Sequence, residues 1–309
     1  MNQVDDDVSA LTQTPAPARQ TEQHVRPTDD RPLTRIDGRT SWAWIDVLEI
    51  WRFRELFYYL TLRDVKLRYK QTILGVGWSF FQPLATIIVF VLFVGVLGKA
   101  RGDMGYGEYI LYVMAGVIPW TFFASSVQNA GNSLLNNHTL VTKTYFPRLA
   151  LPSANVFAAL FDFAICLVLF AFSILGFAAF GQPVSVGPQL LLLPVVVVLL
   201  VLLALGLGII FSALIAAQRD FRFLITFGIQ LWMFATPCIY LPPGSYGETT
   251  KTILMVNPVY GLIANFRACA LGQPLDWASF AVAAVLSLAV FAFALVYFRR
   301  VDRTLADTI

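Results

Sequence analysis

The sequence predicts an all-α integral membrane protein with six transmembrane helices. The chain of 309 residues is 57% hydrophobic and only 13% charged, whereas soluble domains carry about 25% charged residues. Several uncharged stretches are long enough to cross a hydrocarbon core of about 30 Å as helices. The cations gather at alternate ends of these stretches, which is the pattern of the positive-inside rule.

Six apolar stretches are expected to span the membrane. They are residues 76–98, 109–130, 149–176, 190–216, 223–240 and 277–298. The segment 252–266 is also apolar, but it is too short to cross comfortably and the breaker Asn257-Pro258 interrupts it. We therefore expect a re-entrant or interfacial segment before the last span.

The distribution of cations predicts the topology. Most lysines and arginines after residue 50 lie before the first span, between the second and third spans, between the fourth and fifth spans, or after the sixth span. The opposite side carries only Lys99, Arg101, Lys251 and Arg267. Both termini are therefore predicted to be cytoplasmic. The predicted domains are a disordered tail (1–40), an interfacial region (41–72) and a six-helix transmembrane domain (73–309).

A basic amphipathic helix is predicted immediately before the first span. One narrow face carries Tyr58, Leu62, Val65 and Tyr69. The cations Arg63, Lys66 and Lys70 lie opposite, with Asp64 and Arg68 on a flank. Such a helix is typical of a membrane surface, with its apolar face in the headgroup boundary and its cations near anionic lipid.

The sequence contains none of the motifs that would supply chemistry. There is no GxxxxGK[ST] phosphate loop and no GxGxxG turn. Two histidines, His24 and His138, are too few and too far apart for a metal site. The cations sit beside spans rather than on an independent basic face, which argues against nucleic acid. We expect a conduit with no catalytic residue, metal or cofactor, driven by another subunit.

Three segments resemble the signatures of type 2 ABC exporter permeases, which move polysaccharides across the inner membrane. The first is RDVKLRYKQTILGVGWSFFQPL at 63–84, the second NNHTLVTKTYFPRLALP at 136–152, and the third VNPVYGLIANFRACALG at 256–272. The resemblance runs from about Leu56 to the C-terminus, and the segments occur in the family's order on an independently predicted six-span layout.

This resemblance implies a homodimer in the bacterial inner membrane that binds two copies of a separate ATPase subunit. The ATPase would hold ATP and Mg²⁺, and the cargo would be an undecaprenyl-linked O-antigen, capsule-like polymer or teichoic acid. The segment 136–148 would be the coupling helix that docks on the ATPase, through His138, Lys143, Tyr145, Phe146 and Arg148. An ordinary positive-inside loop is the alternative interpretation.

Two further sets of residues are candidates for contact with cargo. Four cations of the amphipathic helix are placed to attract the lipid pyrophosphate or, equally, to anchor the helix to anionic lipid: Arg63, Lys66, Arg68 and Lys70. Sugar rings slide along aromatic faces, so a channel wall is predicted from the aromatic series, although such residues also pack bundles. The series is Trp78, Phe80, Phe81, Trp120, Phe122, Phe123, Trp232, Phe234 and Tyr240.

Asp162 is the only charged residue between Arg148 and Arg219, about midway along the third span. A carboxylate at that depth should face protein or a polar cavity. Candidate partners of Asp162 are Gln128, Asn129 and Asn132. The carboxylate is expected either to form a structural hydrogen bond or to take part in proton transfer or substrate binding.

Two predictions concern the outer side and the thiols. Arg267 is expected on the outer side, free to contact a phosphate or the partner subunit, and the alternative is a capping loop whose half-helices close the bundle. The three cysteines, in apolar surroundings, are expected to be free, and a Cys238–Cys269 disulfide on the outer side is the alternative.

Three other functions remain as alternatives. A lipid or drug exporter would have the same fold. A membrane-embedded enzyme acting on lipid-linked sugar would need clustered charges at a membrane face. An ion-coupled transporter would show inverted repeats.

Overall fold

The structure is a computed structural model. It describes residues 54–70, 75, 77–99, 102, 104–143, 147–181, 187–236 and 247–308, without the side chains of 141–143, 248, 251 and 302–308. The predicted tail, the start of the interfacial region, Tyr145, Phe146 and Tyr240 lie outside these residues. Within the described ranges every regular element is a helix.

Five described helices are long and apolar enough to cross a membrane. They are Gly77–Leu97, Tyr106–Asn136, Ala150–Ala179, Pro188–Ala217 and Trp277–Val301. The predicted first, second, third, fourth and sixth spans are thereby confirmed as apolar helices, with ends that differ by up to six residues. The predicted fifth span overlaps a shorter apolar helix, α8 (Phe221–Phe234).

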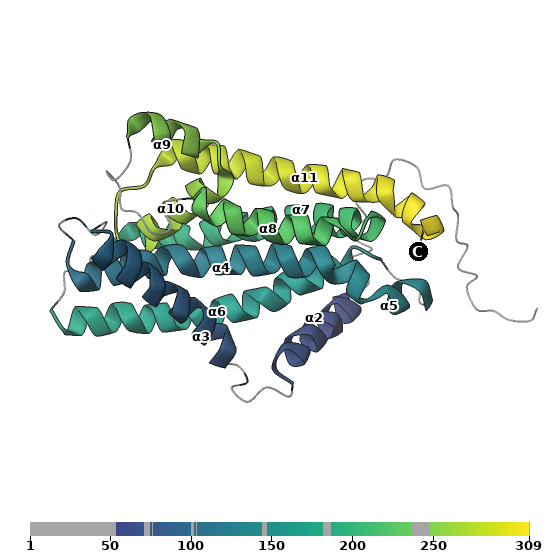
Figure 1. The fold of residues 1–309 in the computed structure, drawn as a ribbon, viewed down its shortest axis with the longest axis horizontal. Helices are drawn as coiled ribbons and strands as arrows, with labels where there is room; N and C mark the ends of the chain where they lie inside the picture. Colours follow the sequence, from purple (N-terminus) through teal and green to yellow (C-terminus); the bar gives the residue numbers. More distant parts are fainter. Residues whose placement is uncertain are drawn as a thin grey trace, which may run out of the picture. The chain divides into compact units, whose positions relative to one another are not determined.

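The centre of the helical unit is α4 (Tyr106–Asn136), which is surrounded by other helices (Figure 1). It packs against α6 (Ala150–Ala179), α7 (Leu193–Ala217) and α10 (Pro258–Ala270). Every residue from 111 to 120 is buried. Small residues permit this close packing, since a Cβ atom on Gly208 of α7 would lie 2.6 Å from the Cβ of Ala130.

The first span changes from an α-helix to a π-helix partway along its length. It begins as α3 (Gly77–Val89) and continues as the π-helical η1 (Phe90–Leu97). Gly95 of η1 lies against the ring of Tyr109, where a Cβ atom would come within 2.2 Å of Cε1. The absence of a side chain at this position therefore lets the first span close on the start of α4.

One end of the helical unit is held by a second apolar cluster. It joins α2 (Arg54–Tyr69), the end of α4, the start of α6 and the ends of α7 and α11 (Trp277–Thr308). Its buried residues include Leu60, Leu134, Leu151, Ile209 and Leu295. Figure 1 shows the short α5 (His138–Lys143) and the C-terminus at this same end.

Helices α7 and α11 run parallel to each other. Gly206 of α7 lies against the backbone of Phe291 of α11. Further along both helices, Ile209 and Ala213 share a cluster with Leu295 and Phe298. Both helices therefore end at the end of the unit that α2 and α5 occupy.

The predicted break at Asn257 is confirmed. It separates α9 (Glu248–Met255) from α10, and it is the N-cap residue of α10. The Asn257 side chain accepts hydrogen bonds from the Val259 backbone N–H and the Trp232 indole, and it donates to the Thr236 hydroxyl. A single side chain thus caps α10 and ties it to the end of α8.

Candidate functional site

Helix α2 packs through the face that carries polar residues, contrary to the pattern expected from its apolar stripe. Its two buried residues are Leu60 and Asp64, and it lies against α6. Phe57 meets Phe157 of α6 edge-on, with ring centroids 5.1 Å apart. Tyr58, on the predicted apolar face, is 62% exposed. The polar face is buried because it finds charged and amide partners on three other helices.

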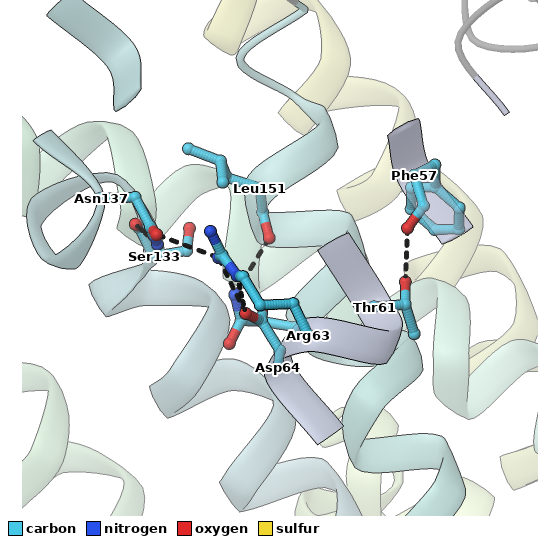
Figure 2. A network of polar contacts seen from close by, with 8 residues as sticks. Phe57, Thr61, Arg63, Asp64, Ser133, Asn137 and Leu151 are labelled. Carbon is cyan, nitrogen blue, oxygen red and sulfur yellow. Dashed lines mark hydrogen bonds and ion pairs between the residues drawn. The ribbon is translucent and has the colours of Figure 1, made fainter. Parts of the chain in front are cut away.

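The first set of these contacts joins α2 to the end of α4 (Figure 2). Arg63 donates through Nε and Nη2 to Asp64 Oδ1, at 3.0 and 2.8 Å. Its Nη2 also donates to Asn137 Oδ1 at 3.0 Å. Asn137 is the C-cap residue of α4 and donates to the Ser133 carbonyl. Arg63 is thereby fixed to the residue that precedes α5.

The second set joins the end of α2 to α3 and α6. Arg68 Nη1 lies 2.5 Å from Asp162 Oδ2, and both side chains are 23% exposed. The Tyr69 hydroxyl donates to Asp162 Oδ1, and Ser79 Oγ donates to the same oxygen at 3.1 Å. Asp162 therefore joins α6 to α2 and α3, whose contacting residues precede it by 83 to 94 positions.

The predicted partners of Asp162 were wrong. Gln128 donates instead to Thr226 of α8, and Asn132 donates to the carbonyl of Gln128 on its own helix. The expectation that Asp162 faces protein is confirmed, but its partner is Arg68. The pairing could not be found by pattern, because the two residues lie 94 positions apart and neither helix's periodicity specifies it.

Tyr69 supplies a pH prediction. Burial, followed by its hydrogen bond to Asp162, raises the pKa of Tyr69 to about 12 from 10.0. A raised folded-state pKa means that the hydroxyl's contribution to stability is complete below about pH 10 and is lost toward pH 12. We therefore expect the stability lost in Tyr69→Phe to be constant from about pH 6 to 9 and to shrink above about pH 10.

The measurement is the difference in apparent melting temperature between wild type and Tyr69→Phe across this pH range. Tyr58→Phe is the matched control, because Tyr58 lies on the same helix and is exposed. A difference for Tyr69→Phe that stays unchanged up to about pH 11 would contradict the assignment.

The four cations of the predicted amphipathic helix that were expected to contact lipid pyrophosphate or anionic lipid have different surroundings. Arg63 and Arg68 are held by Asp64, Asn137 and Asp162 within the protein. Lys66 and Lys70 are exposed.

The predicted channel aromatics fall into a buried group and a group that is at least partly exposed. Trp120, Phe122 and Phe123 are 4%, 3% and 0% exposed and belong to the main core. Phe122 packs on Phe163, and Phe123 packs on Trp232. Residues buried within one chain do not line a passage, so the prediction is corrected for these three. Those that remain at least partly exposed are Trp78, Phe80, Phe81, Trp232 and Phe234.

The predicted coupling segment follows α4 as the short helix α5, and His138 at its start is exposed. Arg148 lies just before α6 and is half-buried. The side chain of Lys143 and all of Tyr145 and Phe146 lie outside the described part of the chain. The docking role therefore remains a prediction.

Arg267 does not lie free on the outer side, and that prediction is wrong. It is 3% exposed. Its guanidinium carbon lies 3.5 Å from the centroid of the Tyr112 ring, and its Nε donates to the Tyr112 carbonyl at 3.2 Å. Arg267 thus fastens α10 to α4 inside the protein.

Cys166 and Cys269 are free and buried, as expected, and Cys238 lies outside the described residues. Among the residues that the structure describes, no group of three histidine, cysteine or acidic side chains is placed to hold a metal ion.

The polar face of α4 that neighbours α8 was not predicted as a site. It carries Ser125, Gln128, Asn129 and Asn132, all partly exposed. Their spacing of three and four residues was readable from the sequence as one helical face. It was not recognised because Gln128, Asn129 and Asn132 were interpreted as candidate partners of Asp162.

The helices define a multi-pass membrane protein with a buried central helix and a charged helix fixed at one end. Comparison with known families gives the class more narrowly. Residues 55–271 match the model of the ABC-2 type transporter family, and the chain belongs to this family.

Three characterised relatives cover most of the same region. An O-antigen export system permease protein RfbA from Myxococcus xanthus is 28% identical over 223 residues, which is 72% of this chain and 82% of the relative. Two proteins of the same name from Klebsiella pneumoniae are 28% identical over 214 and 217 residues, which is 69% of this chain and 79% of each relative.

Proposed function

We propose that this chain is the permease subunit of an ATP-driven exporter that moves undecaprenyl-linked polysaccharide across the bacterial inner membrane. The observation that carries the proposal is the likeness to permeases named for O-antigen export, which extends over about four fifths of each relative. A drug or lipid exporter of the same family would share the fold. The exported cargo therefore has to be tested directly.

We infer six membrane crossings from the direction of the helices. Helices α7 and α11 both end at the α2 end of the unit. The chain must therefore return between residues 217 and 277, and α8 begins only a few residues after α7. With α8 as the returning span, the C-terminus lies on the cytoplasmic side, as does α5, which agrees with the positive-inside rule.

The segment α9–α10 is then a re-entrant pair on the outer side. Burial of α10 among α4, α7 and α11 supports this placement. A helix too short to span is tolerated at membrane depth where it is enclosed by protein.

The energy source is proposed to be a separate ATPase subunit, with two permease chains in the complete exporter. Support comes from the family and from the position of α5, which directly follows the residue that Arg63 holds. Movement of α5 on the ATPase would therefore reach α2 through one hydrogen-bonded contact. Lys66 and Lys70 on the exposed side of α2 are placed to meet a lipid pyrophosphate.

A strain lacking this chain tests the proposed function. We expect it to lose its surface polysaccharide and to accumulate lipid-linked polymer inside the cell, and wild-type protein should restore export. A Tyr145→Ala/Phe146→Ala protein should be present in the membrane at normal level yet fail to restore export, because these two aromatic residues are the proposed contact with the ATPase subunit. Unchanged surface polysaccharide in the deletion strain, with no polymer retained, would refute the function.

A further inference from the structure

In the inner half of α4, the residues that the rest of the chain does not bury share one face of the helix. Between Thr121 and Asn136, the residues that are not buried recur at spacings of three and four. Six of these eight are polar and none is charged: Thr121, Ala124, Ser125, Gln128, Asn129, Asn132, Leu135 and Asn136. The ten residues before this stretch, 111 to 120, are all buried, so the open face begins at Thr121.

A second polar stripe lies on α8, at Arg222, Thr226 and Gln230, which are all exposed. These residues are four positions apart and so share one side of the helix. The nearby Ile225 and Ile229 are the residues that α8 buries. Helix α8 therefore has a packing side and, next to it, a polar side.

Two contacts show that the stripes of α4 and α8 lie side by side. Gln128 Nε2 donates to Thr226 Oγ1 at 3.1 Å, and this bond is exposed. The rings of Phe123 and Trp232 meet edge-on with centroids 5.4 Å apart. The earlier residue on α4, Phe123, contacts the later residue on α8, Trp232. The two helices are therefore antiparallel. The two polar stripes therefore form one continuous surface.

The position of this surface within the membrane follows from the exposed aromatic side of α8. Phe223, Phe227 and Phe234 are 67%, 59% and 57% exposed. An apolar face of this extent on a membrane protein lies in hydrocarbon or against another subunit. Thr226 and Gln230 lie within the same stretch of helix, and hence at the same depth. Polar side chains at that depth face protein or a water-filled cavity.

We propose that this surface is the wall of the passage that the sugar chain of the exported polymer follows. The polar track consists of Ser125, Gln128, Asn129, Asn132, Thr226 and Gln230. Amides and hydroxyls each donate and accept hydrogen bonds, which matches the hydroxyl groups of an uncharged saccharide in any register.

The track deepens the proposed function, because it names the surface that would contact the polysaccharide. The inference that water reaches the track does not depend on which cargo is exported. The inference that the track contacts sugar rests on the proposed function. A second copy of this chain is the competing occupant, since amide side chains also bond across helices in membranes.

Cysteine labelling in the complete exporter tests the track. Asn129→Cys and Thr226→Cys are introduced singly after Cys166, Cys238 and Cys269 are replaced by alanine in a background that retains export. Phe227→Cys is the matched control, one residue from Thr226 on the apolar side of α8. Membranes are treated with a charged, water-soluble methanethiosulfonate, in strains that do and do not synthesise the lipid-linked polymer.

We expect both track cysteines to react at least about tenfold faster than Phe227→Cys, because the charged reagent reaches a thiol that faces water and is excluded from one that faces hydrocarbon. Polymer synthesis should slow the track cysteines and leave the control unchanged. Equally slow labelling at all three positions would overturn the track. Oxidative cross-linking of two copies through Asn129→Cys would also overturn it, by showing a subunit contact. Fast labelling that polymer does not slow would overturn the sugar contact.

A failure of the proposed function would be recognised separately. In that case the wild-type protein would export no polymer, while the labelling difference between Thr226→Cys and Phe227→Cys would persist. Side-chain chemistry supplies a further readout in an exporting strain. Gln128→Leu should reduce export by about fivefold, whereas Gln128→Asn, which keeps an amide, should retain most of it. Equal export by the two variants would overturn the role of hydrogen bonding.

Discussion

Replacing Arg68 by alanine is expected to destabilise the protein by about 1–3 kcal/mol. The variant leaves the Asp162 carboxylate, which is 23% exposed, without its cation. Breaking a fully buried pair costs about 3–5 kcal/mol, and partial exposure places this one lower. The loss also leaves Tyr69 as the remaining contact of the end of α2 with Asp162 of α6, so export should fall together with stability.

The companion variant Asp162→Asn is expected to cost less than Arg68→Ala. Arg68 has a long side chain that can turn its charge toward the headgroups when its partner is removed. The carboxylate on α6 has no comparable freedom. For a chain of this size, a loss of 1 kcal/mol lowers the melting temperature by about 2–4 °C. The measurement is therefore the apparent melting temperature of each purified variant, alongside export in cells.

Lys66→Ala and Lys70→Ala are the matched controls, because they remove exposed cations from the same helix. Their effect on stability should stay within about 0.5 kcal/mol. Exchange of the pair, Arg68→Asp with Asp162→Arg, should recover part of the loss. Arg68→Ala that melts at the same temperature as Lys66→Ala would show that the ion pair does not hold α2.

Replacing Gly261 by leucine is expected to have a second large effect, at about 3 kcal/mol or above. A Cβ atom at Gly261 of α10 would lie 2.5 Å from the Ser279 backbone carbonyl and 2.8 Å from the Cβ of Ala283 on α11. The nearest atom belongs to the backbone of a helix, which cannot rotate aside as a side chain can. Helix α10 would have to move away from α11, and its contact with α4 through Arg267 would be lost.

Gly228→Ala is the control for this substitution. Gly228 is also a helical glycine, but a Cβ atom there would meet nothing within 4 Å. Alanine at such a position is neutral or stabilising by up to about 1 kcal/mol. The yield of monodisperse protein and its melting temperature distinguish the two outcomes. Gly261→Leu that behaves like Gly228→Ala would mean that α10 and α11 are not in contact at this point.

The spans were predictable from sequence because hydrophobic length alone determines them. The third was expected at 149–176 and is found at Ala150–Ala179, and the sixth begins at Trp277 as expected. The break at Asn257 was also predicted, because the residue before a proline disfavours helix and asparagine caps the next one.

The packing partners were not predictable, because they depend on residues that are distant in sequence. The apolar stripe of α2 suggested a membrane surface, but Asp64 and Arg68 determine which side of the helix is buried. Phe122 and Phe123 carry the same side chains whether they line a channel or fill a core. Only their neighbours on α6 and α8 place them in the core.

The central claim is that this chain forms a passage for polysaccharide and that a separate ATPase drives the transport. Its most direct test is a transport assay in sealed vesicles containing purified permease, the ATPase subunit and undecaprenyl-linked polymer. We expect polymer to cross only when both proteins and ATP are present, and the permease alone to hydrolyse no ATP. Transport by the permease without the ATPase, or ATP-driven transport of a lipid or drug but not of the polymer, would contradict the claim.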